Sequence, residues 1–163
     1  MNWKWMPAAV LCVAGMAVPA AAQRSHGYWF VAPGGATSGA HTRFSLHMGG
    51  GGEIALRRGV ALGLEAGAWG LPNDYIDSVI GIASLNGTYH FLPSRDDKWD
   101  PFATAGYSLA FRSGTRNMVN YGGGFNYWFQ PSVAVRVEFR DHYSDRLHLW
   151  GLRFGLSFRD LMP

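Results

Sequence analysis

One triplet in this chain of 163 residues has the residue types of a hydrolase: His142, Tyr143 and Ser144. A histidine beside a serine can take the hydroxyl proton and make the oxygen nucleophilic, provided that an acid orients the imidazole. Asp145 follows the serine, and no glutamate follows in this region. We therefore predict no catalytic residues. His142 and Ser144 are kept as the candidates of an alternative, enzymatic hypothesis, and are otherwise expected to be solvated loop residues.

Other kinds of chemistry lack their usual patterns. The six histidines and the single cysteine, Cys12, do not have the spacing of metal ligands, so we predict neither a metal site nor a cofactor. The glycine runs 49–52 and 122–124 lack the Lys-Ser/Thr pair of a phosphate loop. The net charge is only +3 and the sequence contains no run of basic residues, so no nucleic-acid partner is expected.

The elements that carry the remaining polar residues are predicted to be β-strands. Apolar and polar residues alternate at every second position, which is the period of a strand and not of a helix. Turn signals rich in Gly, Pro, Asn and Asp separate these segments. The eight predicted strands span residues 28–36, 43–56, 60–69, 78–91, 102–112, 119–129, 133–141 and 147–159.

The polar face of these strands has the composition of a narrow interior. Glu53, Glu65 and Glu138, the only glutamates, all lie in the polar phase, among positions filled mainly by Gly, Ser, Thr and Asn. A narrow lumen needs small side chains around a few charges that neutralise one another. We therefore predict an eight-stranded antiparallel up-and-down transmembrane β-barrel, all-β, with apolar side chains facing lipid. Its lumen is expected to hold an ion-pair network of Glu53, Glu65, Glu138, Arg112, Arg136, Arg140 and Arg153.

Aromatic residues gather towards the ends of the predicted strands, where barrels carry girdles at the membrane surfaces. An even number of antiparallel strands allows the sheet to close into a barrel, so that no strand edge exposes unpaired backbone groups to lipid. The predicted girdle consists of Trp69, Tyr89, Phe91, Phe102, Tyr121, Tyr127, Trp150 and Phe158.

The N-terminus is built like a cleavable signal peptide. Lys4 precedes an apolar run, and residues 20–22 offer an Ala-x-Ala cleavage site. We predict a signal peptide over residues 1–22, which removes Cys12, and a barrel domain over 23–163. An uncleaved anchor is the alternative, and the shortness of the run disfavours it.

Three stretches resemble the outer-membrane β-barrel domain family, the small eight-stranded barrels of the outer membrane protein A and opacity-protein type. They are residues 83–91 (ASLNGTYHF), 101–107 (PFATAGY) and 135–142 (VRVEFRDH), and residues 151–158 (GLRFGLSF) resemble the terminal strand that the barrel-assembly machinery recognises. The resemblance implies a monomer in the outer membrane of a Gram-negative envelope, in contact with lipid and lipopolysaccharide. It also implies that the connections near residues 37–42, 70–77, 113–118 and 142–146 face outward from the cell.

Three alternatives stay open at this stage. The His-x-Ser spacing resembles that of the outer-membrane lipid A deacylase, although Asp145 replaces the expected Asn. A gated ion pathway through the lumen is a second alternative. A soluble periplasmic lipid-binding barrel is the third. The leading prediction is a non-enzymatic barrel with a structural or surface-interaction role.

Overall fold

The computed structural model describes residues 25–72, 79–92 and 97–159, so the predicted signal peptide lies outside the described residues. The described chain forms eight antiparallel strands, as predicted. They are β1 (His26–Ser38), β2 (His41–Arg57), β3 (Val60–Gly70), β4 (Ile80–His90), β5 (Trp99–Phe111), β6 (Thr115–Gln130), β7 (Val133–Ser144) and β8 (Leu147–Arg159).

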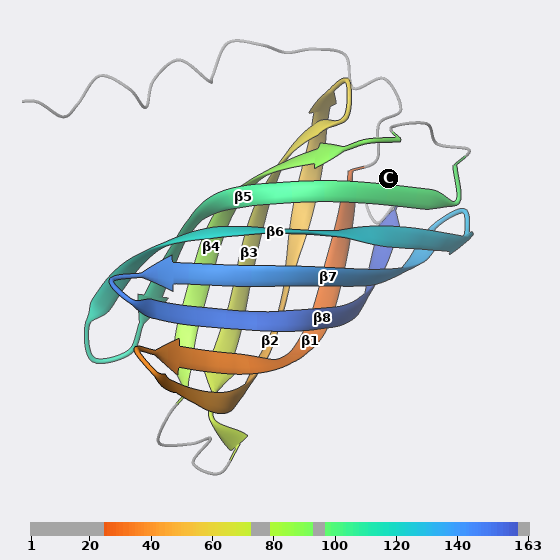
Figure 1. The fold of residues 1–163 in the computed structure, drawn as a ribbon. Helices are drawn as coiled ribbons and strands as arrows, with labels where there is room; N and C mark the ends of the chain where they lie inside the picture. The colour runs from red at the N-terminus through yellow and green to blue at the C-terminus, as the bar shows by residue number, and fades with distance from the viewer. Residues whose placement is uncertain (1–24, 73–78, 93–96, 160–163) are drawn as a thin grey trace, which may run out of the picture.

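The strands close into an up-and-down barrel (Figure 1). Each strand pairs with its neighbours in sequence, and β1 also pairs with β8, from His26 opposite Arg159 to Ser38 opposite Leu147. The connections β2–β3, β4–β5 and β6–β7 lie at the end of the barrel where β1 begins, here called the three-connection end. The other four connections lie at the four-connection end. Within the described residues, no helix is long and apolar enough to cross a membrane.

The strands are longer than predicted and the hairpins correspondingly tighter. Gly39 and Ala40 alone join β1 to β2, where residues 37–42 were expected to form a loop. Asp145 and Arg146 join β7 to β8, both with positive φ (41° and 69°), as a two-residue type I′ turn requires. Residues 142–144, expected in a loop, therefore belong to β7. The short turns expected near 57–59 and 130–132 are confirmed.

Apolar side chains point outward and polar ones inward, as the alternation predicted. Leu64, Leu85 and Ile54 are 68%, 56% and 67% exposed, whereas Glu138, Arg136 and Arg153 are each 1% exposed. A soluble barrel would need the opposite arrangement, with an apolar interior and a charged exterior. The interpretation as a soluble lipid-binding barrel is therefore wrong.

One carboxylate breaks the apolar pattern of the outer wall. Asp141 lies in the outward phase of β7, where its Oδ2 atom accepts hydrogen bonds from the Tyr121 hydroxyl (3.0 Å) and His148 Nδ1 (2.8 Å). These partners come from β6 and β8, the two strands that flank β7. The cluster lies near the four-connection end, because β7 ends only three residues later.

Candidate functional site: the charged lumen

Two arginine–glutamate pairs cross the lumen and tie together strands that are not neighbours. Arg153 of β8 makes a bidentate contact with Glu65 of β3, with Nη1–Oε2 and Nη2–Oε1 distances of 2.7 and 3.0 Å. Arg136 of β7 donates from Nη2 to Glu53 Oε1 of β2 at 3.1 Å. The bidentate geometry fixes both partners, which is how a buried charge pair recovers part of its desolvation cost.

Glu138 stands at the centre of the network. Its carboxylate contacts Arg136 (3.0 Å) and Arg140, both from β7, and lies 3.7 Å from Arg153 Nη1 of β8. Arg140 also donates from Nη1 to Asn120 Oδ1 at 2.8 Å. Three guanidinium groups around one buried carboxylate make Glu138 the residue that joins the two cross-lumen pairs into one network.

His90 and Asp100 extend the network towards the three-connection end. His90 places Nδ1 2.9 Å from Asp100 Oδ1 and Nε2 3.1 Å from Glu53 Oε2. Carboxylate oxygens only accept hydrogen bonds, so both ring nitrogens donate when the two acids are ionised. His90 is then an imidazolium, and the network balances Glu53, Glu65, Glu138 and Asp100 against three arginines and this histidine. The ion-pair network predicted from the sequence included neither His90 nor Asp100.

Aromatic rings inside the lumen cover the faces of the arginines. The Arg136 guanidinium carbon lies 4.2 Å from the centroid of the Tyr28 ring and 4.1 Å from that of Phe102. Arg153 lies 4.2 Å from the Phe30 ring centroid. Stacking of this kind stabilises a cation at sites that water cannot reach. The placement of Phe102 in the outer girdle is therefore wrong, because Phe102 shares the inward phase of β5 with Thr104.

The four-connection half of the lumen contains an apolar cluster, which the sequence did not lead us to expect. Trp69 was expected in the girdle, but it is 3% exposed because it shares the inward phase of β3 with Glu65. Its ring stacks on His47 at a centroid distance of 4.6 Å. The apolar cluster around it consists of Trp69, Ile82, Ala110, Met118 and Leu149.

The other predicted girdle residues do lie on the outer wall. Tyr89, Phe91, Tyr121 and Trp150 are exposed, and Tyr127 and Phe158 are half-buried in the outward phase. Whether these six rings mark the membrane surfaces stays a prediction.

Arg112 does not join the lumen network. Its position has inward parity, but β5 ends at Phe111, and the Arg112 backbone N–H donates to Gly114 O in the turn that follows. Its side chain is exposed at the four-connection end. The other six residues of the predicted network are all buried within the barrel.

The candidate hydrolase pair also lies inside the barrel. His142 is fully buried, with Nδ1 3.0 Å from Ser108 Oγ and Nε2 3.2 Å from Arg153 Nη2. Because an arginine can only donate, Nε2 is the acceptor and the Nδ1 proton points at Ser108. Both ring nitrogens are thus occupied by residues other than Ser144. The expectation of solvated loop residues is wrong, and the geometry offers His142 no role as a base towards Ser144.

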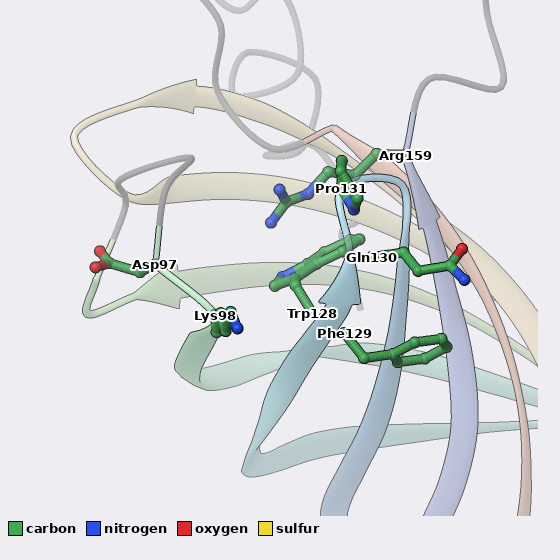
Figure 2. A pocket seen from close by; sticks show the side chains of 7 residues that line it. All are labelled: Asp97, Lys98, Trp128, Phe129, Gln130, Pro131 and Arg159. Carbon is green, nitrogen blue, oxygen red and sulfur yellow. The ribbon is translucent and has the colours of Figure 1, made fainter.

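A third arginine that stacks on an aromatic ring lines a cavity of about 430 Å³ at the three-connection end. The Arg159 guanidinium carbon lies 3.3 Å from the Trp128 ring centroid. Figure 2 shows the guanidinium and the indole nitrogen pointing towards the side of Asp97 and Lys98, whereas Phe129 and Gln130 point the other way. In the described residues, no group of three His, Cys, Asp or Glu side chains is arranged to hold a metal ion.

Several solved structures share this fold. The N-terminal β-barrel domain of Pseudomonas aeruginosa OprF has 20% sequence identity and a TM-score of 0.58, covering 83% of this chain and 98% of its own. Neisserial surface protein A (NspA) has 11% identity and a TM-score of 0.69, covering 83% and 97%. Ail of Yersinia pestis, in complex with the heparin analogue sucrose octasulfate, has 8% identity and a TM-score of 0.58, covering 82% and 96%.

The sequence itself matches a family over nearly its whole length. No curated protein matches the chain. Residues 8–159 match the family described as outer membrane protein beta-barrel domain. The match includes all eight strands, whose outward apolar and inward charged faces are the pattern of a barrel embedded in lipid. The chain belongs to the outer membrane protein beta-barrel domain family.

Proposed function

We propose that this protein is a non-enzymatic outer-membrane barrel that stays closed and serves a structural or surface-interaction role in the Gram-negative envelope. The observation that carries the proposal is the pair of cross-lumen contacts, Arg153–Glu65 and Arg136–Glu53, which block the interior with neutralised, packed side chains. Eight strands leave an interior just wide enough for side chains, so such a plug leaves no permanent aqueous path.

The biogenesis and orientation follow from the same proposal. Residues 1–22 act as a cleaved signal peptide, and the assembly machinery inserts the barrel as a monomer among outer-membrane lipid and lipopolysaccharide. The four-connection end faces the outside of the cell. The hairpins Gly39–Ala40 and Asp145–Arg146 are too short to form a large receptor surface, which favours the structural role.

Planar-bilayer recording tests the closed lumen. The purified barrel is expected to show no steady large conductance. Arg153→Gln removes one end of the bidentate pair, and the variant is expected to be less stable but still closed, because the neighbouring rings and Glu138 still fill the lumen. Arg57→Gln, in the exposed end of β2, is the matched control. Steady, large channels in the folded wild-type protein would contradict the proposal.

A further inference from the structure

A hydrogen-bonded polar cluster lies on the outer wall near the four-connection end. Asp141 accepts hydrogen bonds at Oδ2 from the Tyr121 hydroxyl and from His148 Nδ1. The Tyr143 ring lies against the imidazole of His148, with the two centroids 4.7 Å apart. Asp141 itself is 6% exposed, whereas the side chain of His148 is 40% exposed. The carboxylate is therefore enclosed, and the imidazole reaches the surface of the barrel.

The carboxylate of Asp141 requires a positive charge beside it. Its Oδ1 atom is buried and has no hydrogen-bond partner among the described residues. A buried charge without a partner is strongly unfavourable, and His148 Nδ1, 2.8 Å from Oδ2, supplies the ion-pair contact. An imidazolium carries a proton on both ring nitrogens. With Nδ1 donating to Asp141, the second N–H of His148 is left at Nε2, to which no described residue offers an acceptor.

A second cation lies close to this N–H in the sequence. Arg146 precedes His148 by two residues, in the β7–β8 hairpin, and is half-buried. In the part of the chain that the structure describes, its side chain takes part in no hydrogen bond or ion pair. The other hairpin residue, Asp145, is an exposed carboxylate, whose charge is screened by water and salt. The two cations can therefore act together on an anion at the wall.

The height of the cluster matches one surface of a membrane. The outward positions of β8 beyond His148 all carry apolar side chains: Trp150, Leu152, Phe154, Leu156 and Phe158. Ten residues along the strand from His148 to Phe158 correspond to roughly 34 Å, or about 24–28 Å of height at a tilt of about 35–45°. The apolar band of outer-membrane barrels is about 25 Å tall. With Phe158 at one margin of this band, His148 lies at the other, at the level of lipid headgroups.

We propose that His148 and Arg146 bind a phosphate group of lipid A in the outer leaflet, and that Asp141 holds the imidazole protonated with its Nε2–H towards the lipid. Phosphate oxygens accept strong, charge-assisted hydrogen bonds from imidazolium and guanidinium groups. The inference deepens the proposed surface role and rests on the proposed orientation, because lipid A occupies the outer leaflet. It does not depend on whether the lumen is closed.

Native mass spectrometry of the folded, full-length mature barrel in dodecyl maltoside micelles tests the site. Titration with diphosphorylated lipid A gives the dissociation constant of the first bound lipid. The same lipid without its phosphates should bind about tenfold more weakly, because two charged contacts are lost. Bound diphosphorylated lipid A should also protect His148 from modification by diethyl pyrocarbonate, mapped on peptides. Equal binding of the two lipids, or unchanged modification of His148, would overturn the proposal.

Substitutions of the two cations locate the contact. His148→Gln and Arg146→Gln should each weaken binding of diphosphorylated lipid A about threefold and leave binding of the phosphate-free lipid unchanged. Arg57→Gln, exposed at the opposite end of the barrel, is the matched control and should change neither. An equal loss in all three variants would mean that the barrel attracts the lipid by its overall charge, which would overturn the site. Phosphatidylglycerol that displaces lipid A at equal concentration would overturn the choice of lipid.

The substitution Asp141→Asn distinguishes a positioning role from simple repulsion. A carboxylate that repels phosphate would, once removed, leave tighter binding; one that holds the imidazolium would leave weaker binding. We expect binding about threefold weaker, with the preference for the phosphorylated lipid reduced. Asp145→Asn, which removes an exposed carboxylate, should not weaken binding. Tighter binding by folded Asp141→Asn would overturn the role of the acid, and if this variant does not fold, His148→Gln and Arg146→Gln decide the question.

The orientation on which the choice of lipid rests is tested separately. Gly114→Cys places a thiol in the exposed β5–β6 turn, where a Cβ has open space. The single cysteine of the sequence, Cys12, lies in the predicted signal peptide. A membrane-impermeant maleimide should label the variant in intact cells. Labelling in lysates but not in intact cells would overturn the lipid A site, whereas steady conductance would contradict the closed lumen and leave this site standing.

Discussion

Each charged residue in the lumen is held in place by partners on other strands, and the strand register determines which residues meet. Glu53, Glu65 and Glu138 and their arginines could be predicted, because charged residues in the small-residue phase of a strand must share the lumen. Phe102 and Trp69 were expected on the outer wall because they lie near strand ends. The alternation of side chains along β5 and β3 places both of them in the lumen instead. Asp100 was missed because it precedes the predicted start of its strand. The stacking of rings on Arg136 and Arg153 has no signal in one sequence.

Removing the central carboxylate should destabilise the barrel strongly. Glu138→Gln leaves Arg140 and Arg136 without a charged partner at that point, and breaking a buried pair from one side costs about 3–5 kcal/mol. The free energy of unfolding, measured by urea titration in detergent micelles with tryptophan fluorescence, should fall by about that amount. Arg57→Gln, which is exposed, should change it by less than about 0.5 kcal/mol. Near-wild-type stability of Glu138→Gln would show that the network is dispensable.

Several glycines lie where any side chain would collide with the neighbouring strand. A Cβ on Gly155 of β8 would lie within 1.9 Å of the Trp29 carbonyl oxygen of β1, and one on Gly124 would lie within 2.0 Å of Val137 O. These close approaches lie in the ladders β1–β8 and β6–β7. The small residues in the polar phase of the strands predicted a narrow lumen, but only the register shows which glycine lies at the seam between the first and last strands.

A methyl group at that seam should weaken closure of the barrel. Gly155→Ala forces Trp29 and the β1 backbone to shift, and overpacking of this kind costs about 1–3 kcal/mol. Heat-modifiable gel migration should show the compact form lost at a lower temperature than in wild type. Gly114→Ala is the matched control, because a Cβ there has open space around it. Equal melting of the two variants would mean that the seam tolerates the added volume.

The elements themselves were predicted more fully than their ends. All eight strands follow from the two-residue period, which any sheet with two different faces imposes. Their ends did not, because residues 37, 38 and 142–144 are polar and resemble loop residues in composition. In the structure these residues continue the ladders towards the four-connection end, where polar side chains are as favourable on a strand as in a loop. His142 was assigned to a loop for the same reason.

The whole molecule has an exterior suited only to lipid over much of its height. Leu64, Ile54 and Phe44 are each more than 60% exposed on the outer wall. The hydrogen-bonded cluster of Asp141, Tyr121 and His148 lies near the four-connection end of the same wall. Such a surface cannot be dissolved in water without aggregation, because its apolar area is continuous around the barrel.

Membrane fractionation tests whether the whole protein is integrally inserted in the outer membrane. The protein should sediment with outer membranes and stay there in alkaline carbonate, which strips proteins held by charge alone. Release into the supernatant would contradict integral insertion. Leu64→Asp places a charge on the lipid-facing wall, and it should reduce the inserted fraction because a charged side chain in contact with lipid is unfavourable. Leu92→Asp, just beyond the end of β4, should insert like wild type.

The pairing of β1 with β8 also determines when the chain can fold. His26 meets Arg159, so the ladder that closes the barrel joins residues from opposite ends of the domain. Contacts of such long sequence separation make folding slow. A nascent chain that lacks β8 would leave β1 and β7 with unpaired backbone edges, which are unfavourable in lipid. Insertion must therefore follow the completion of synthesis, and the last strand made is the one that permits it.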